Sequence, residues 1–383
     1  MYDVVVIGQG LSGMLSAIWA RELGLRTALV AAGTGKVMQS SGVMDLIPGS
    51  DGGLQEWARL NQLTTLNKSQ LAGAIDQFKA LTKKVGYRYK GEIDDLISIV
   101  TGSGHIKKTA FYPETISPLP EQGHVVIVGF QELIDFQPAY IKGNLQKARP
   151  ELSIDTMKIE LGNHSQRTMT QLDAARLLDQ KEVRNHCITQ IKAQMATKKM
   201  SQPDLFIFPA SLGVDEWKET IEQFSFELKG RVTEAPGMPP NTTAIRLNER
   251  LKKEAVKSGV RFYTDTTVVG CTMDEDQIKS LTIQLANKVT ELGGKQFILA
   301  TGGILGGGLE ATPDGVKETA LRLETDEFGQ LIHCPSNLLP AGASKSTKVT
   351  HHGVTGGVYS IFSAHELVAK LHQQPMMGVT CSA

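Results

Sequence analysis

Residues 2–33 read YDVVVIGQGLSGMLSAIWARELGLRTALVAAG. The β-branched run at 2–7 predicts a strand buried on both faces. Apolar spacing over 14–23 predicts a helix that ends at Gly24, and residues 25–31 predict a second strand. The stretch is therefore a complete strand–helix–strand unit, which indicates an α/β, Rossmann-like nucleotide-binding fold.

Three glycines connect the first strand to the helix in the pattern G-x-G-x-x-G. Gly8 permits the tight turn, Gly10 lets the backbone approach a pyrophosphate, and Gly13 allows close packing of helix on strand. The free N–H groups at the helix start favour a bound phosphate. The pattern predicts a dinucleotide-type site, and a tight turn without a ligand is the alternative.

The second strand departs from the usual dinucleotide pattern at its end. Such strands commonly end in Asp or Glu, whose carboxylate binds the adenosine ribose. Here the residues from 30 to 33 are Val-Ala-Ala-Gly. An adenosine ribose would need another partner, or the cofactor would lack that half.

Segments near the end of the chain add the features of a flavin site. The sequence ATGG at 300–303 closes a predicted strand, and its small residues allow a close approach to a ligand. The sequence THHGVTGG at 350–357 opens the last predicted helix, whose N-terminus would face the electron-rich edge of a flavin. Simple glycine-rich turns are the alternative for both segments.

One further position in the late segments departs from the flavoenzyme pattern. Related flavoenzymes commonly read A-G-D, with the Asp bound to a ribityl hydroxyl, whereas residues 341–344 here read AGAS. That hydrogen bond is therefore absent or comes from Ser344.

Composition excludes several classes of function. The 383 residues include 40 Lys plus Arg and 40 Asp plus Glu, so no global charge attracts nucleic acid. The four cysteines form no C-x-x-C pair, and we expect no metal site. The chain opens directly into a strand and has no apolar run near the ~20 residues of a membrane span. We expect a cytoplasmic protein.

The flavin-binding fold is predicted to be split by an insertion. We expect its first part at 1–85, an inserted α+β cap domain at 86–240, and its second part at 241–383. The proline-rich run TEAPGMPPNTT at 233–243 marks the return from the insertion. Residues 55–100 are predicted to be mainly helical, and 205–209 to form a strand.

Six segments together resemble the B subunit of anaerobic glycerol-3-phosphate dehydrogenase. They are GQGLSG (8–13), SSGVMDLIPG (40–49), VGFQELIDFQP (128–138), PPNTTAIRLNERL (239–251), ILATGG (298–303) and HHGVTGGVYS (351–360). The resemblance covers nearly the whole chain, and the third and fourth segments are more specific than the glycines.

The resemblance implies a fold like that of the fumarate reductase and succinate dehydrogenase flavoproteins. It implies oxidation of sn-glycerol 3-phosphate to dihydroxyacetone phosphate, with electrons passing to quinone. The implied partners are a larger FAD-bearing A subunit and an iron–sulfur C subunit at the inner face of the cell membrane. The family's B subunit is associated with FMN, which agrees with the missing ribose carboxylate, whereas the glycine pattern favours FAD.

The candidate catalytic residues are His351 and His352, as bases beside the flavin-facing helix start, and Arg246, which could bind an anionic group of the substrate. The histidines could instead only shape the turn, and Arg246 could lie on a solvated helix face. Asp45 and Ser41 could touch flavin or substrate, or serve as turn residues. The predicted flavin contacts are Gly8, Gly10, Leu11, Ser12, Gly13, Ser40, Ser41, Gly42, Val268, Ala300, Thr301, Gly302, Gly342, Ala343, Gly353, Val354 and Thr355.

Two other functions fit the same sequence. One is a stand-alone FAD oxidoreductase that acts on another small acid or alcohol. The other is a scaffold subunit without a cofactor, which the missing ribose carboxylate and the alanine at 343 favour. A bound flavin would distinguish either flavoprotein from the scaffold.

Overall fold

The computed structural model describes residues 1–45, 68–162, 168–345 and 356–373, and the chain divides into two compact units. Unit 1 comprises the described residues of 1–36, 54–81 and 250–383, and unit 2 those of 37–53 and 82–249. The insertion limits expected after residues 85 and 240 stay a prediction, because compactness does not define where an insertion begins.

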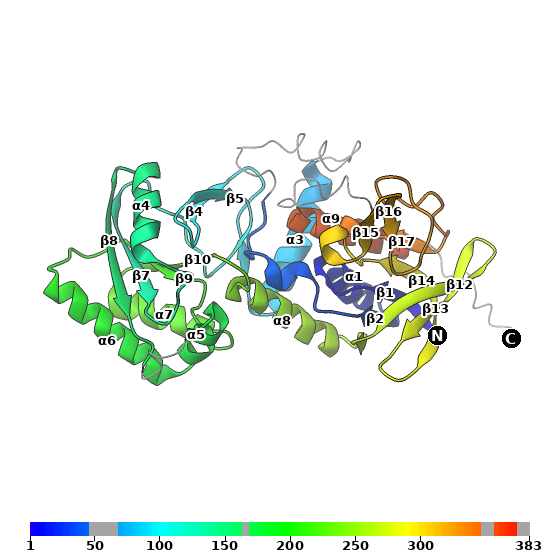
Figure 1. Ribbon diagram of the computed structural model, residues 1–383, viewed down its shortest axis with the longest axis horizontal. Coiled ribbons are helices and arrows are strands. Elements are labelled where there is room, and N and C mark those ends of the chain that lie inside the picture. The colour runs from blue at the N-terminus through cyan, green and yellow to red at the C-terminus, as the bar shows by residue number, and fades with distance from the viewer. Residues whose placement is uncertain (46–67, 163–167, 346–355, 374–383) are drawn as a thin grey trace. The chain divides into compact units, whose positions relative to one another are not determined.

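Unit 1 is built on a seven-stranded sheet in the order β11-β2-β1-β14-β13-β12, with β17 also paired to β14 (Figure 1). The strands β11, β2, β1, β14 and β17 are parallel, and β12, β13 and β14 form an antiparallel meander. The bounds are β1 Tyr2–Ile7, β2 Thr27–Ala31, β11 Arg261–Thr264, β12 Thr267–Asp274, β13 Gln277–Gln284, β14 Val289–Leu299 and β17 Leu338–Pro340.

The opening strand–helix–strand unit is confirmed. Strand β2 is buried along its whole length, and β1 is buried from Val4 onward, as the continuous apolar runs predict. Helix α1 (Leu11–Glu22) packs against β1, β2 and helix α9 (Gly356–Gln373). Because β1 and β14 run parallel, Gly8 and Ala300 follow the same edge of the sheet.

Smaller elements complete unit 1. A hairpin is formed by β15 (Leu309–Thr312) and β16 (Gly315–Glu318), and two short 3₁₀ turns lie at Ile304–Gly306 and Gly342–Lys345. Helices α3 (Lys68–Lys84) and α8 (Thr242–Lys257) each cross a limit between the two units.

Unit 2 contains a separate four-stranded sheet in the order β10-β9-β7-β8, in which all strands are parallel. Its strands are β7 Gly123–Phe130, β8 Leu152–Ile159, β9 Leu205–Pro209 and β10 Arg231–Ala235. Its connecting helices are α4 Pro138–Ala148, α5 Gln171–Leu178, α6 Lys181–Thr197 and α7 Trp217–Leu228. The described part of unit 2 is therefore built around a parallel α/β sheet.

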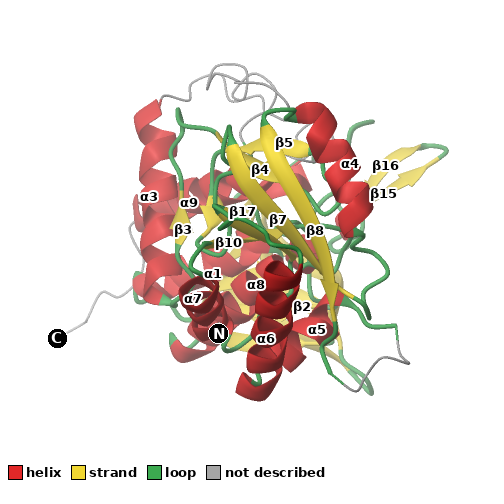
Figure 2. Ribbon diagram, turned by 90° about the vertical axis from the view of Figure 1, so that its left-hand side faces the viewer, coloured by secondary structure: helices red, strands yellow, loops and turns green. Residues whose placement is uncertain are grey.

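The two faces of this sheet bury alternate residues of the same strands. Val126 and Phe206 belong to the core that includes residues of α5, α6 and α7, whereas Val125 and Leu205 belong to the core that includes residues of α4 (Figure 2). A parallel sheet covered on both faces requires strands that are apolar at every position, which explains LFIFP at 205–209.

Residues 55–100 are predicted to be mainly helical; residues 55–67 lie outside the described residues, and over 68–100 the prediction is confirmed only for α3. Residues 89–100 contain the strands β3 (Tyr89–Lys90) and β4 (Ile97–Val100), which pair with β6 (Tyr112–Pro113) and β5 (Ile106–Thr109). None of these four short strands was predicted from the sequence. None of the helices in the described ranges combines the length and apolar character needed to cross a bilayer.

Candidate functional site

The glycine turn after β1 has the geometry of a ligand cradle. Gly8 has φ +103°, and a Cβ there would lie 2.4 Å from the carbonyl oxygen of Ala300. A Cβ at Gly13 would lie 2.0 Å from the carbonyl oxygen of Gly8. By contrast, no atom of the described residues lies within 4 Å of the Cβ position of Gly10. The turn is therefore packed tightly on the protein side and open at Gly10, where a ligand would approach.

The start of helix α1 is free to bind an anion. Gly10 is the N-cap residue and offers no side-chain cap, and the first turn contains no acidic residue. The N–H of Met14 is the first to bond within the helix, with the carbonyl oxygen of Gly10 as acceptor. The N–H groups of Leu11, Ser12 and Gly13 have no acceptor in the described part of the chain, and a phosphate fits such a group of donors.

The segment after β14 lies directly against this turn. The N–H of Ala300 donates to the carbonyl oxygen of Ile7 at 2.8 Å. The hydroxyl of Thr301 is buried and has no hydrogen-bond partner in the described part of the chain. Gly302 has φ +86°, which favours glycine. The predicted segment 300–303 therefore lies against the glycine turn at 8–13, and among the described residues the buried Thr301 hydroxyl has no hydrogen-bond partner.

Gly342, another predicted flavin contact, lies against the start of helix α1. It has φ +57°, and a Cβ there would lie 2.8 Å from the Ser12 hydroxyl oxygen. The Ser344 hydroxyl is buried and bonded to the backbone oxygens of Leu299 and Ala341. That hydroxyl therefore serves the local backbone, and it is not a substitute for the Asp of the A-G-D pattern. Ala343, next to Gly342, is half-buried.

Lys345, in the same 3₁₀ turn, was not predicted from the sequence. Its ammonium lies 5.6 Å from the centre of the Tyr359 ring. Burial, with a smaller effect of Lys370, lowers the pKa of Lys345. A partly buried cation near the start of α9 would stabilise negative charge on a ligand. In the sequence, the only signal for Lys345 is its position three residues after Gly342.

After β2, where the usual carboxylate is missing, the chain contacts the glycine turn. The amide of Gln9 donates to the carbonyl oxygen of Gly33 at 2.6 Å. A Cβ at Gly35 would lie 3.0 Å from the backbone nitrogen of Gly10, so the following loop packs onto the glycine turn. Val268, another predicted contact, lies in the apolar core of unit 1.

Three predicted residues of unit 2 form one short segment, Ser40–Gly42. The Ser40 hydroxyl donates to the carbonyl oxygen of Val37, and Gly42 has φ +75°. Nearby, the buried carboxylate of Asp45 forms an ion pair with Lys107 at 2.7 Å. Asp45 is thus held by a cation from β5.

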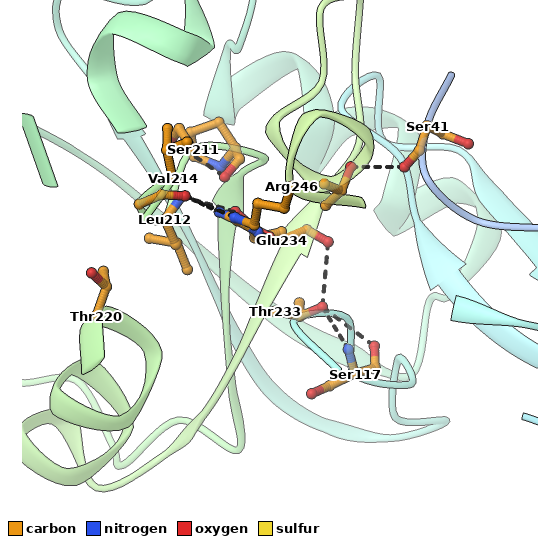
Figure 3. A network of polar contacts seen from close by, with 12 residues as sticks. Ser41, Ser117, Ser211, Leu212, Val214, Thr220, Thr233, Glu234 and Arg246 are labelled. Carbon is orange, nitrogen blue, oxygen red and sulfur yellow. Dashed lines mark hydrogen bonds and ion pairs between the residues drawn. The ribbon is translucent and has the colours of Figure 1, made fainter. Parts of the chain in front are cut away.

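Arg246 lies in a fully buried polar network rather than on a solvated helix face (Figure 3). Its guanidinium donates to both carboxylate oxygens of Glu234, at 2.6 and 2.9 Å, and to the carbonyl oxygen of Gly213. Burial opposes its charge, but Glu234 and Tyr87 together outweigh this effect, and the pKa of Arg246 is raised. These contacts favour a structural role for Arg246 over substrate binding.

The remaining candidates fall in a part of the chain that the structure does not describe. His351, His352, Gly353, Val354 and Thr355 lie outside the described residues. Within the described ranges, no group of three or more His, Cys, Asp or Glu side chains could hold a metal ion.

Comparison with known proteins decides the family. A model described as the FAD binding domain matches residues 3–360, which include the glycine turn and both late segments. The chain belongs to the FAD binding domain family. The fold of this family binds a flavin, which fits the open Gly10 and the uncapped start of α1.

Curated relatives of this FAD binding domain protein share one name, the B subunit of anaerobic glycerol-3-phosphate dehydrogenase. The relative from Mannheimia succiniciproducens is 26% identical over 356 residues, covering 85% of this chain and 80% of the relative. A relative from Halobacterium salinarum, named as a probable member, is 25% identical over 330 residues, covering 82% and 77%. The relative from Aliivibrio fischeri is 26% identical, covering 84% and 78%. The resemblance seen in the sequence is confirmed.

Solved structures match more distantly. A flavocytochrome c3 fumarate reductase is 13% identical with a TM-score of 0.34, covering 79% of this chain and 34% of that one. A 3-ketosteroid Δ1-dehydrogenase from Sterolibacterium denitrificans is 15% identical with a TM-score of 0.36, covering 79% and 48%. This chain thus spans less than half of either solved chain.

Proposed function

We propose that this chain is the flavoprotein B subunit of a glycerol-3-phosphate dehydrogenase complex. In this proposal the complex oxidises sn-glycerol 3-phosphate to dihydroxyacetone phosphate. The observation that carries it is the alignment, over 82–85% of the chain, with relatives that bear this name. The cradle open at Gly10 supports the flavin-binding part of the proposal.

The residues of the glycine turn would hold the cofactor. The N–H groups of Leu11, Ser12 and Gly13 would donate to its phosphate, and the absence of a side chain at Gly10 leaves room for it. The bound flavin would supply the acceptor for the hydride that leaves the secondary alcohol. His351 and His352 remain our proposed bases for the hydroxyl proton.

The bound flavin is either FAD or FMN, and different features of the chain favour each. The complete glycine turn and the family model favour FAD, because a pyrophosphate needs the open Gly10. The end of β2 favours FMN, because it offers no carboxylate to an adenosine ribose, and Gln9 binds the carbonyl oxygen of Gly33 there.

The relatives' names denote one component of a complex of several chains. We propose a larger FAD-bearing A subunit and an iron–sulfur C subunit as partners, with quinone as the final acceptor. The complex would place this chain at the inner face of the cell membrane through those partners. A stand-alone oxidoreductase would need none of them.

The test is to purify the chain alone and co-expressed with the proposed A subunit. Bound flavin is identified by chromatography, and oxidation of glycerol 3-phosphate is followed with an artificial electron acceptor. Glycerol, which lacks the phosphate, is the matched control substrate. We expect activity only with glycerol 3-phosphate and only in the complex. Flavin without such activity would favour the stand-alone oxidoreductase, and no flavin would favour the scaffold.

A further inference from the structure

The side chain of Gln9 links the glycine turn to the residues that follow strand β2. Its amide nitrogen donates to the carbonyl oxygen of Gly33 at 2.6 Å, and the residue is nearly buried, with an exposed fraction of 8%. The backbone joins the same two segments, because the N–H of Gly8 donates to the carbonyl oxygen of Val30 at 2.8 Å. All of these residues belong to unit 1. The amide of Gln9 therefore bridges the glycine turn and the end of β2.

The loop after β2 lies against the same turn. Gly35 has φ +76°, and a Cβ there would lie 2.9 Å from the carbonyl oxygen of Gln9 and 3.0 Å from the Cα of Gly10. At the strand end itself, the carbonyl oxygen of Ala31 accepts the N–H of Thr266 at 3.1 Å. The loop backbone is therefore in direct contact with the glycine turn, and the last carbonyl group of β2 is already hydrogen-bonded.

These contacts lie where dinucleotide sites receive the adenosine ribose. In such sites the pyrophosphate lies at the start of the helix, and the ribose hydroxyls bond a carboxylate at the end of the second strand. Here residues 30–33 contain no carboxylate, and the amide of Gln9 fills the gap between turn and strand. By contrast, no atom of the described residues lies within 4 Å of the Cβ position of Gly10. The phosphate side of the turn is thus open, whereas the adenosine side is occupied.

We infer that Gln9 determines which flavin binds, and that its side chain favours FMN over FAD. The inference rests on the proposed function, since it concerns the flavin proposed to bind at the glycine turn. FMN ends in one phosphate, which the N–H groups of Leu11, Ser12 and Gly13 can bind. The adenosine half of FAD would have to displace the Gln9 amide from Gly33, at the cost of a nearly buried hydrogen bond. The end of β2 offers the ribose no carboxylate in return.

The experiment measures the Kd values of the flavin-free full-length chain for FMN and for FAD by fluorescence titration. Gln9→Ala removes the bridging amide. Gln284→Ala is the matched control, because Gln284 carries the same amide, which donates to the carbonyl oxygen of Leu285 at 2.7 Å at the exposed end of β13. Circular dichroism monitors folding. The readout is the ratio of the Kd for FAD to the Kd for FMN, since a loss of stability alone affects both flavins alike.

We expect the wild-type chain to bind FMN more tightly than FAD. Gln9→Ala should lower the ratio about tenfold, the effect of one or two hydrogen bonds, because the adenosine half no longer has to displace the amide. Gln284→Ala should keep the wild-type ratio.

Two results for Gln9→Ala would overturn the inference while the proposed function stands. One is an unchanged ratio, and the other is a raised ratio, which would mean that Gln9 binds the ribose instead of excluding it. Should Gln9→Ala fail to fold, the wild-type chain still decides, because tighter binding of FAD than of FMN would overturn the inference. A wild-type chain that binds neither flavin would instead overturn the proposed function.

Discussion

Replacing Arg246 with methionine should lower the free energy of unfolding by about 3–5 kcal/mol, the usual cost of removing one partner from a buried ion pair. Both side chains of the Arg246–Glu234 pair have an exposed fraction of 0%. Without the guanidinium, the carboxylate keeps the N–H of Leu212, at 2.8 Å, and the carbonyl oxygen of Gly213 loses the guanidinium as a donor. Urea unfolding followed by circular dichroism measures the change as a shift of the midpoint at constant slope.

Two further variants separate the buried charge from general damage. Adding Glu234→Gln to Arg246→Met removes the stranded charge, and we expect the double variant to be more stable than Arg246→Met alone. Lys192→Met breaks an ion pair with Glu227 whose side chains are 49% and 39% exposed, and it should cost less than about 1 kcal/mol. A loss below about 1 kcal/mol for Arg246→Met would refute the structural role and return Arg246 to the substrate-binding candidates.

Three other predictions concern single contacts. Gly10→Ala should fold normally, because its Cβ meets no atom of the described residues, but it should lose flavin, because the Cβ occupies the side open to the ligand. Gly13→Ala should also lose stability, because its Cβ would lie 2.0 Å from the carbonyl oxygen of Gly8. Equal melting temperatures for the two variants would contradict this. Burial, with a smaller effect of Glu132, raises the pKa of the Cys187 thiol to about 12. At pH 8, iodoacetamide should therefore modify Cys187 only after unfolding. Peptide mass spectrometry should find that the exposed Cys334 is labelled before Cys187. The Asp179 carboxylate accepts the N–H groups of Val214, Asp215 and Glu216 in the turn before helix α7. Asp179→Ala should cost about 1–3 kcal/mol of unfolding free energy, because it leaves these donors without that acceptor; an unchanged urea midpoint would refute this role in holding the turn.

The parts of the fold that local patterns determine can be predicted from the sequence. A strand buried on both faces is apolar at its buried positions, so VVVI at 4–7 and LFIFP at 205–209 predict the strands β1 and β9. The glycine turn is likewise predictable, because its φ angles and close contacts admit only glycine at Gly8 and Gly13.

Features that depend on distant partners escape prediction. The strands β3 and β4 lie in a stretch predicted to be helical. Strand β3 pairs with residues 22–24 positions away and β4 with residues 6–12 positions away, and neither partner was predicted to be a strand. From the sequence, Arg246 is predicted either to bind substrate or to lie on a solvated helix face. Its helical spacing gives no sign that its partner is the buried Glu234 on β10. The side chains of Asn241 and Thr243 donate to the carbonyl oxygens of Ser40 and Ser41, 201 and 202 positions away, which no local motif predicts.

Flavin binding is tested most directly by the cofactor content of the purified wild-type protein. The protein is denatured, and the released flavin is identified and quantified by chromatography against its visible spectrum. We expect about one flavin per chain, with FAD as the product if the glycine turn binds a pyrophosphate and FMN if the end of β2 excludes adenosine. A protein that releases no flavin, even after incubation with both FAD and FMN, would contradict its assignment as a flavoprotein.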